Sequence, residues 1–248
     1  MDKVAALVIA SDDIAYLLAK RVKSSFSYFH PDIPVHIFTL DDEEEIFGNV
    51  IYPKKSGHIG CFSIRCLEHL KKDNDLVIKL DADVVVTGKM NEFLEKDYDV
   101  ACSLNEPGIP GIDYVRFPDY CNLGVTAVRS MDFAKEWREK CYDDKFVGEQ
   151  NFIYFEQDVM NYLAFSGKYK TLLVDKEGVY YNEQSKPYWD RLRVKCKELF
   201  IDDRPVKALH WAGGGEIGTK FNHPAFSNEV RSFLNRVTDT HDFKPREE

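Results

Sequence analysis

The stretch VIKLDADVVV, residues 77–86, is the most informative part of this sequence. Its apolar residues predict a buried β-strand over residues 76–81 that ends in acid. Because side chains alternate along a strand, Asp81 and Asp83 are expected to point to one side and Ala82 to the other. Ligands of open α/β sheets bind outside the carboxyl ends of the strands. The stretch therefore predicts an α/β fold with a binding site at its two acids.

The two acids predict a divalent metal ion. Carboxylates held together at the end of a buried strand repel each other and lose hydration, which disfavours ionisation of both unless a cation lies between them. A hard divalent ion with oxygen ligands removes that conflict. The competing interpretation is a solvated turn after a strand, because D-x-D is common by chance. The apolar residues before Asp81 favour the metal.

Elsewhere, apolar runs alternate with amphipathic stretches, as in a mostly parallel sheet covered by helices. Further strands are predicted at residues 4–10, 35–40, 84–86, 99–104, 123–128, 171–174 and 206–210. Helices are predicted at residues 14–29, 63–72, 131–141, 158–165 and 227–237. Ser11 or Asp12 is expected to cap the first helix, and the acidic run 41–45 to form a solvated loop or helix start. We expect one domain over residues 1–238 and a charged, fraying tail over 239–248.

The composition of the chain argues against several classes of protein. The 248 residues include 33 Lys and Arg against 42 Asp and Glu, and the net charge of −9 argues against a nucleic-acid binder. No apolar run reaches the roughly 18 residues of a membrane span, and the first residues are expected to form a strand rather than a signal peptide. The six cysteines form no C-x-x-C pair, which predicts reduced thiols and a cytoplasmic protein.

A phosphatase of the haloacid dehalogenase class is one alternative. In that class a D-x-D follows an apolar strand, and its first Asp, here Asp81, is the nucleophile. The segment LFIDD, residues 199–203, resembles the late acidic pair of these enzymes. Their nucleophile strand normally starts the fold, however, whereas strand–helix–strand–helix sections precede Asp81 here.

Four short motifs occur in an order that resembles a known family. They are LDADV at 80–84, NLGV at 122–125, QDVMN at 157–161 and HWAG at 210–213. Over about residues 4–220 the chain resembles the metal-dependent GT-A glycosyltransferases, closest to family 8, which includes glycogenin and bacterial galactosyltransferases. The resemblance implies a single-domain GT-A fold of the α/β class, with a mixed, mostly parallel sheet flanked by helices.

The resemblance also implies an activity. A sugar would pass from a nucleoside-diphosphate sugar, with UDP preferred because the family uses it, to a glycan or glycoside acceptor, with Mn²⁺ or Mg²⁺ as cofactor. The implied metal ligands are Asp81, Asp83 and His210. The implied nucleotide-sugar contacts are Ala10, Ser11, Asp12, Arg65, Asp81, Ala82, Asp83, Asn122, Gly124, Gly213 and Lys220. Lys220 would replace, from a shifted position, the Lys of the Lys-Pro-Trp that the family places after its histidine.

The catalytic residues implied by the resemblance are Gln157, beneath the anomeric carbon, and Asp158, against the sugar. Transfer would then retain the anomeric configuration. Glu156 departs from the family's usual Asp, and an inverting enzyme would need one of these carboxylates as a general base, so both outcomes stay open. Simpler roles compete: a capping Asp158, a surface Arg65 and an ordinary strand-end His210. A carbohydrate-binding relative without turnover is a third candidate.

Overall fold

A six-stranded sheet forms the centre of the fold. The computed structural model describes residues 2–48, 58–105, 112, 114–177, 179, 186–210, 221 and 224–239. The strand order is β2-β1-β3-β6-β5-β7. The strands are β1 (Val4–Ala10), β2 (Val35–Thr39), β3 (Leu76–Leu80), β5 (Val100–Leu104), β6 (Cys121–Val128) and β7 (Thr171–Leu173). Only β6 runs antiparallel to its neighbours. The predicted mixed, mostly parallel sheet is confirmed.

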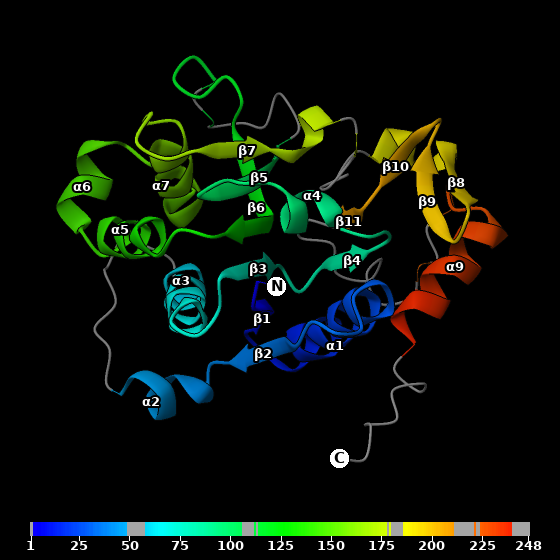
Figure 1. The fold of residues 1–248 in the computed structure, drawn as a ribbon, viewed down its shortest axis with the longest axis horizontal. Coiled ribbons are helices and arrows are strands. Elements are labelled where there is room, and N and C mark those ends of the chain that lie inside the picture. Colours follow the sequence, from blue (N-terminus) through cyan, green and yellow to red (C-terminus); the bar gives the residue numbers. More distant parts are fainter. Residues whose placement is uncertain are drawn as a thin grey trace.

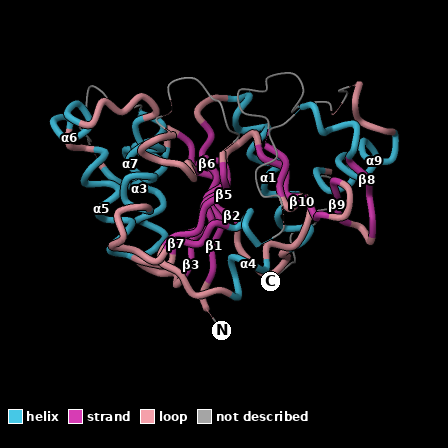
Figure 2. Tube along the Cα trace, turned by 90° about the horizontal axis from the view of Figure 1, so that it is seen from above, coloured by secondary structure: helices cyan, strands magenta, loops and turns pink. Residues whose placement is uncertain are grey.

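Helices cover both faces of this sheet, which stands between them in Figures 1 and 2. One face carries α1 (Asp13–Phe29) and, beyond it, α9 (Asn228–Thr238). The other carries α3 (His58–Lys71), α5 (Met131–Cys141) and α7 (Phe155–Ala164). The remaining helical segments are short: α2 (Asp42–Phe47), α4 (Asn91–Glu95), α6 (Asp144–Glu149), η1 (Val174–Glu177) and η2 (Lys186–Arg191).

Side-chain alternation along the strands creates two cores. In β1, Ala6 and Val8 pack on the α1 side, whereas Leu7 packs on the α3 side. In β3, Ile78 faces the α1 side and Val77 the α3 side. Both faces of the central strands are therefore buried, which explains their nearly continuous apolar sequence.

The first helix has the expected cap, but some helices differ from their expected bounds. Asp12 caps α1 by accepting the N–H of Ala15 at 2.8 Å, as predicted. Two helices begin earlier than predicted: α3 at His58 and α7 at Phe155. Apolar side chains near these starts, including Cys61 and Phe62 of α3, pack into the core on the α3 side of the sheet. Because these residues are buried, the helices continue past the residues whose amphipathic pattern predicts a helix.

Two small sheets lie beside the main one. One contains β8 (Leu192–Lys195), β9 (Glu198–Ile201) and β10 (Arg204–Val206) in the order β10-β9-β8, and the other pairs β4 (Val84–Val86) with β11 (Ala208–His210). The single strand predicted over residues 206–210 is thus wrong. It is divided because Val206 pairs with Leu199, whereas the segment from Ala208 pairs with β4.

No helix in the described part of the chain is long and apolar enough to cross a membrane. None of the six cysteines forms a disulfide, and only Cys196 is exposed. Helix α9 ends at Thr238, so the predicted charged tail falls almost entirely on residues 240–248, which lie outside the described residues.

Candidate active site

A turn, rather than an extended strand, presents the two acids. Strand β3 ends at Leu80, and the N–H of Val84 donates to the carbonyl of Asp81 at 3.1 Å. The N–H of Asp81 donates to the carbonyl of Gly124 at 2.9 Å, which ties the turn to β6. The predicted alternation along a strand is therefore not what places Asp81 and Asp83 together. The turn brings both carboxylates to the end of the sheet.

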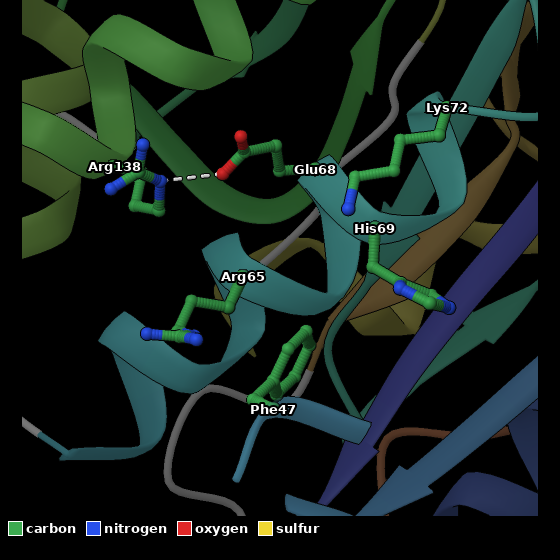
Figure 3. Close-up of a pocket in the computed structure, with 6 residues that line it drawn as sticks. All are labelled: Phe47, Arg65, Glu68, His69, Lys72 and Arg138. Atoms are coloured by element: carbon green, nitrogen blue, oxygen red, sulfur yellow. Dashed lines mark hydrogen bonds and ion pairs between the residues drawn. The ribbon is translucent and has the colours of Figure 1, made fainter. Parts of the chain in front are cut away.

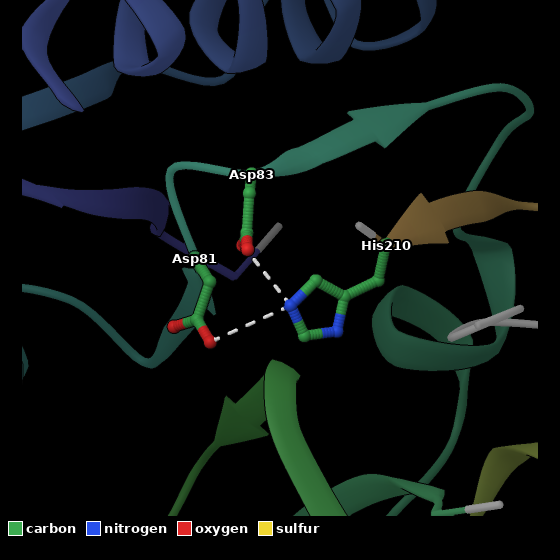
Figure 4. Close-up of side chains that lie close together, drawn as sticks. All are labelled: Asp81, Asp83 and His210. Atoms are coloured by element: carbon green, nitrogen blue, oxygen red, sulfur yellow. Dashed lines mark ion pairs between the residues drawn. The ribbon is translucent and has the colours of Figure 1, made fainter. Parts of the chain in front are cut away.

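His210 joins the two acids through the pairing of β11 with β4, in which His210 lies opposite Val84. Its Nε2 lies 3.0 Å from Oδ1 of Asp83 and 3.9 Å from Oδ2 of Asp81, with both carboxylates facing the imidazole (Figure 4). The His210 side chain is only 4% exposed, whereas those of Asp81 and Asp83 are 37% and 25% exposed. The three groups converge at a partly open position.

These three residues fit a divalent metal ion. Their ligand atoms all lie within 4.8 Å of one another. Two ligands that bind one ion at about 2.1 Å and at right angles or wider lie roughly 3.0–4.2 Å apart, so the 3.0 and 3.9 Å separations need little change. Two carboxylate oxygens and one imidazole nitrogen suit Mn²⁺ at least as well as Mg²⁺.

Gly124 makes room for the imidazole. A Cβ at this position would lie 2.5 Å from both Cε1 and Nδ1 of His210, closer than any real contact allows. The side chain of Asn122 holds the same segment by accepting the N–H of Gly124 at 2.6 Å. The two predicted contact residues therefore shape the wall behind His210.

Lys79 is a buried cation beside the acids. Its Nζ donates to Oδ1 of Asp81 at 2.5 Å and to the carbonyl of Leu123 at 3.2 Å, and its side chain is 6% exposed. Desolvation raises the pKa of Asp81, but the positive charge of Lys79 and the nearby His210 outweigh it, so the pKa of Asp81 is lowered. Asp81 is thus kept ionised. The signal in the sequence was a charged residue inside an otherwise apolar strand.

A cleft of about 940 Å³ opens in front of this group. Ser11 and Asp12, at the end of β1, line it as predicted, together with Ala82. Ala10 lies beneath them and is only 2% exposed. The other lining residues are Ile9, Ala15, Leu18, Leu40, Ile59, Gly60, Ser63, Lys79, Asp81, Asp83, Ile153, Tyr154, Phe155 and Glu156. The cleft joins the carboxyl ends of β1 and β3, where ligands of α/β sheets bind.

Comparisons with known proteins give matches among solved structures. No protein-family model and no curated protein matches the chain. The galactosyltransferase LgtC, in complex with donor and acceptor sugar analogues, matches with a TM-score of 0.60 and 17% identity over 94% of this chain and 95% of that one. The chain has the GT-A fold of glycosyltransferases.

Two further structures show the same GT-A fold. A glycosyltransferase involved in the glycosylation of the major capsid of PBCV-1 matches with a TM-score of 0.54 and 12% identity, over 85% of this chain and 93% of that one. The glycosyltransferase GlyE of Streptococcus pneumoniae matches with a TM-score of 0.56 and 18% identity, over 94% of this chain and 60% of that one. The fold implied by the four motifs is thereby confirmed.

In this GT-A fold, Glu156 supplies the carboxylate that faces the cleft from α7. A Cβ on Gly60 would lie 2.2 Å from Cδ of Glu156, so the missing side chain of Gly60 leaves space for the acid. Burial raises the pKa of Glu156, the negative charges of Asp81 and Asp158 add to the rise, and Lys79 opposes it. The sequence predicted a sugar contact for Asp158, whereas the acid of this segment that lines the cleft is Glu156.

Asp158 and Gln157 bind the protein itself. The carboxylate of Asp158 accepts the N–H groups of Ile153 and Tyr154 at 2.7 and 2.6 Å and the hydroxyl of Tyr120 at 2.6 Å. The amide of Gln157 accepts the N–H of Leu123 at 3.1 Å and donates to the Tyr120 hydroxyl at 3.2 Å. These bonds join the start of α7 to the start of β6 and to the loop that borders the cleft.

Arg65 is not brought to the acids. It lies on another face of α3, where its guanidinium is 4.7 Å from the centre of the Phe47 ring. With Phe47 it lines a separate cavity of about 230 Å³, in which Arg138 donates to Glu68 at 2.5 Å (Figure 3). His69 and Lys72 complete this cavity. The competing role as a packed helix-surface residue describes Arg65 in this structure, whereas Ile59, Gly60 and Ser63 are the α3 residues of the cleft.

Two predicted contact residues, Gly213 and Lys220, lie outside the described residues. The segment LFIDD lies within the β9–β10 hairpin, where Asp202 pairs with Arg191 and Asp203 with Lys195. Both acids of this segment therefore form ion pairs with residues near the hairpin.

Proposed function

We propose that this chain is a glycosyltransferase that moves a sugar from a nucleoside-diphosphate sugar, with UDP preferred, to a glycan or glycoside acceptor, in a reaction that depends on a divalent metal. The observation that carries the proposal is the convergence of Asp81, Asp83 and His210 at the edge of a cleft in a GT-A fold. The six cysteines outside any disulfide, five of them buried, suit the reducing cytoplasm that we propose as its compartment.

Each part of the cleft has a role in this proposal. Asp81, Asp83 and His210 hold Mn²⁺ or Mg²⁺, which when bound acts as a Lewis acid on the departing diphosphate. Ser11 and Asp12, at the end of β1, are proposed to bind the nucleoside. Ala10 is proposed to bind it as well, through its backbone. Gly213 and Lys220 are proposed to contact the diphosphate.

The sugar would lie between the acids and the start of α7. Glu156 is the carboxylate of α7 that lines the cleft and would contact the sugar. By the family resemblance, Gln157 would lie beneath the anomeric carbon, and transfer with retention is proposed on that ground. Asp158 orders the loop before them. Inversion, with Glu156 as general base, is the competing outcome, since a raised pKa suits a base.

A thermal-shift experiment tests the proposal. The melting temperature is measured with UDP, GDP, CMP or a phosphate mimic, each with and without Mn²⁺ or Mg²⁺. A ligand that binds only the folded state raises the melting temperature. Stabilisation by one nucleoside diphosphate that requires the metal supports the proposal and names the base of the donor. Stabilisation by a phosphate mimic and Mg²⁺ alone would replace it with the phosphatase.

Turnover separates a transferase from a silent binding relative. The nucleoside-diphosphate sugar with the stabilising base is incubated with the protein and metal, and release of the nucleotide is followed with and without candidate glycan acceptors. Proton NMR of the glycoside product gives its anomeric configuration. Binding without any nucleotide release would contradict the enzymatic part of the proposal.

A further inference from the structure

Lys79 carries a positive charge in the middle of the main sheet. It lies in β3, opposite Leu7 of β1 on one side and Thr126 of β6 on the other. Val77, two residues earlier on the same face, is completely buried in the core beside α3. An apolar side chain would satisfy this position. An ammonium group there loses hydration, which is unfavourable unless a nearby anion compensates.

The compensating anion is Asp81. Because residues two apart in a strand share a face, Lys79 points toward the residue that follows the end of β3. Its Nζ donates to Oδ1 of Asp81 at 2.5 Å, while Oδ2 of the same carboxylate lies 3.9 Å from Nε2 of His210. One oxygen of Asp81 is therefore held by Lys79. The other oxygen faces the position proposed for the metal.

The charge balance of the cleft gives this contact its importance. Among the described residues that line the cleft, four are acids: Asp12, Asp81, Asp83 and Glu156. Lys79 is the single basic residue in that described lining. Its Nζ lies 2.5 Å from Oδ1 of Asp81, within the group of acids. Lys79 thus offsets repulsion among the acids before any ion binds.

We propose that Lys79 is a resident cation that holds Asp81 in the metal-free protein and thereby limits the affinity of the free protein for a divalent ion. The inference rests on the metal site of the proposed function. Lys79 and the ion share one carboxylate, and two positive charges at this separation in a partly buried site repel each other. The ammonium therefore stabilises the metal-free protein and weakens ion binding at the same time.

Mn²⁺ binding without nucleotide or sugar provides the test. Free Mn²⁺ is measured by electron paramagnetic resonance, and unfolding by thermal denaturation in EDTA and in Mn²⁺. We expect Lys79→Met to melt at a lower temperature than the unsubstituted protein in EDTA, and its melting temperature to rise more when Mn²⁺ is added. We also expect it to bind Mn²⁺ with a Kd about tenfold lower than that of the unsubstituted protein. Activity is not needed for this readout.

Lys207→Met is the matched control. Lys207 is also buried, at 8% exposure, and its Nζ lies 3.0 Å from Oε2 of Glu198, outside the cleft. We expect this variant to melt at a lower temperature while its Kd for Mn²⁺ stays unchanged. Lys79→Gln provides a second, more polar neutral variant, for which tighter Mn²⁺ binding is likewise expected.

The outcomes separate this inference from the proposed function. If the unsubstituted protein binds Mn²⁺, alone or with UDP, and neither Lys79 variant binds it more tightly, only this inference fails. If no form binds Mn²⁺ even with UDP, the proposed metal site fails as well. Variants that fold only in Mn²⁺ support the inference. Variants that remain unfolded in Mn²⁺ overturn it, because Lys79 would then be required whether or not the ion is present.

Discussion

Oδ1 of Asp83 lies 3.0 Å from Nε2 of His210, although the two residues come from distant parts of the chain. Two structural features create this contact. A turn after β3 presents the acid, and the antiparallel pairing of β11 with β4 places the imidazole opposite Val84. Because the two elements meet in a small sheet of their own, the candidate metal site depends on long-range strand register as well as on the D-x-D motif.

Removal of the Asp83 charge is expected to abolish the response to metal. Asp83→Asn keeps the shape of the side chain but removes an anionic ligand. We expect the rise in melting temperature caused by Mn²⁺ together with UDP to disappear, and metal-dependent transfer with it. Asp97→Asn is the control, because that acid is 91% exposed and pairs with Lys170 at 2.6 Å. A normal Mn²⁺ response in Asp83→Asn would reject the metal assignment.

Gly124→Ala is expected to disturb the site through His210. The new methyl group would lie 2.5 Å from the imidazole, so the ring must move. Overpacking of this kind costs about 1–3 kcal/mol of unfolding free energy. We expect a lower melting temperature and at least partial loss of the Mn²⁺ response. Gly124→Ala combined with His210→Ala removes the contact with the imidazole and leaves the 2.9 Å contact of the new methyl group with Oδ1 of Asn122. The double variant should therefore recover part of the stability but not Mn²⁺ binding; no recovery would contradict the explanation.

Glu156 and Asp158 are expected to respond differently to loss of their charge. Asp158→Asn replaces an acceptor of two backbone N–H groups, so we expect about 2–4 kcal/mol lower unfolding free energy. Glu156→Gln should leave nucleotide binding intact and lower the rate of sugar transfer, because Glu156 lines the cleft. Unfolding titrations and kcat measurements separate the two effects. A stable, inactive Asp158→Asn protein would return the sugar-contacting role to Asp158.

His30 is expected to make stability fall in acid. Burial, with the positive charges of Lys89 and Lys207 adding to it, lowers the pKa of His30 from 6.5 to about 4, and its Nε2 accepts the N–H of Met90 at 3.0 Å. At pH values between these two pKa values, the unfolded chain binds a proton on His30 that the folded chain does not bind. The stabilisation is therefore complete above pH 6.5 and is lost as the pH falls toward 4.

His30→Gln tests that dependence. Urea unfolding is measured at pH 7 and pH 4 for both proteins. The loss of unfolding free energy between the two pH values should be about 3 kcal/mol smaller in the variant. An equal loss in both proteins would show that other groups account for the acid sensitivity.

Much of the fold was predictable because local patterns report local structure. The apolar run before Asp81 predicted β3, and the amphipathic pattern of residues 131–141 predicted α5 with its bounds. The small sheet of β8, β9 and β10 was not predicted, since short hairpin strands leave a weak pattern. The interrupted strand at Val206 went unnoticed for the same reason.

The candidate site was predictable in part. Asp81, Asp83 and His210 were chosen together from motif resemblance, and the structure brings them together. Arg65 was chosen from its helix, but the rotation of α3 turns it toward Phe47 instead. Glu156 and Asp158 are both acids of one helical turn, and only the packing of α7 decides which of them lines the cleft.

Local residue patterns are enough to predict the α/β class, the central strands and the acidic end of β3, because hydrophobic periodicity is set by neighbouring residues. Tertiary structure alone decided that His210 faces Asp83, that Gly124 leaves space for the imidazole, and that Lys79 shares the carboxylate of Asp81 with the proposed metal position. These contacts depend on strand register and on desolvation within a folded core, which no local pattern of residues specifies.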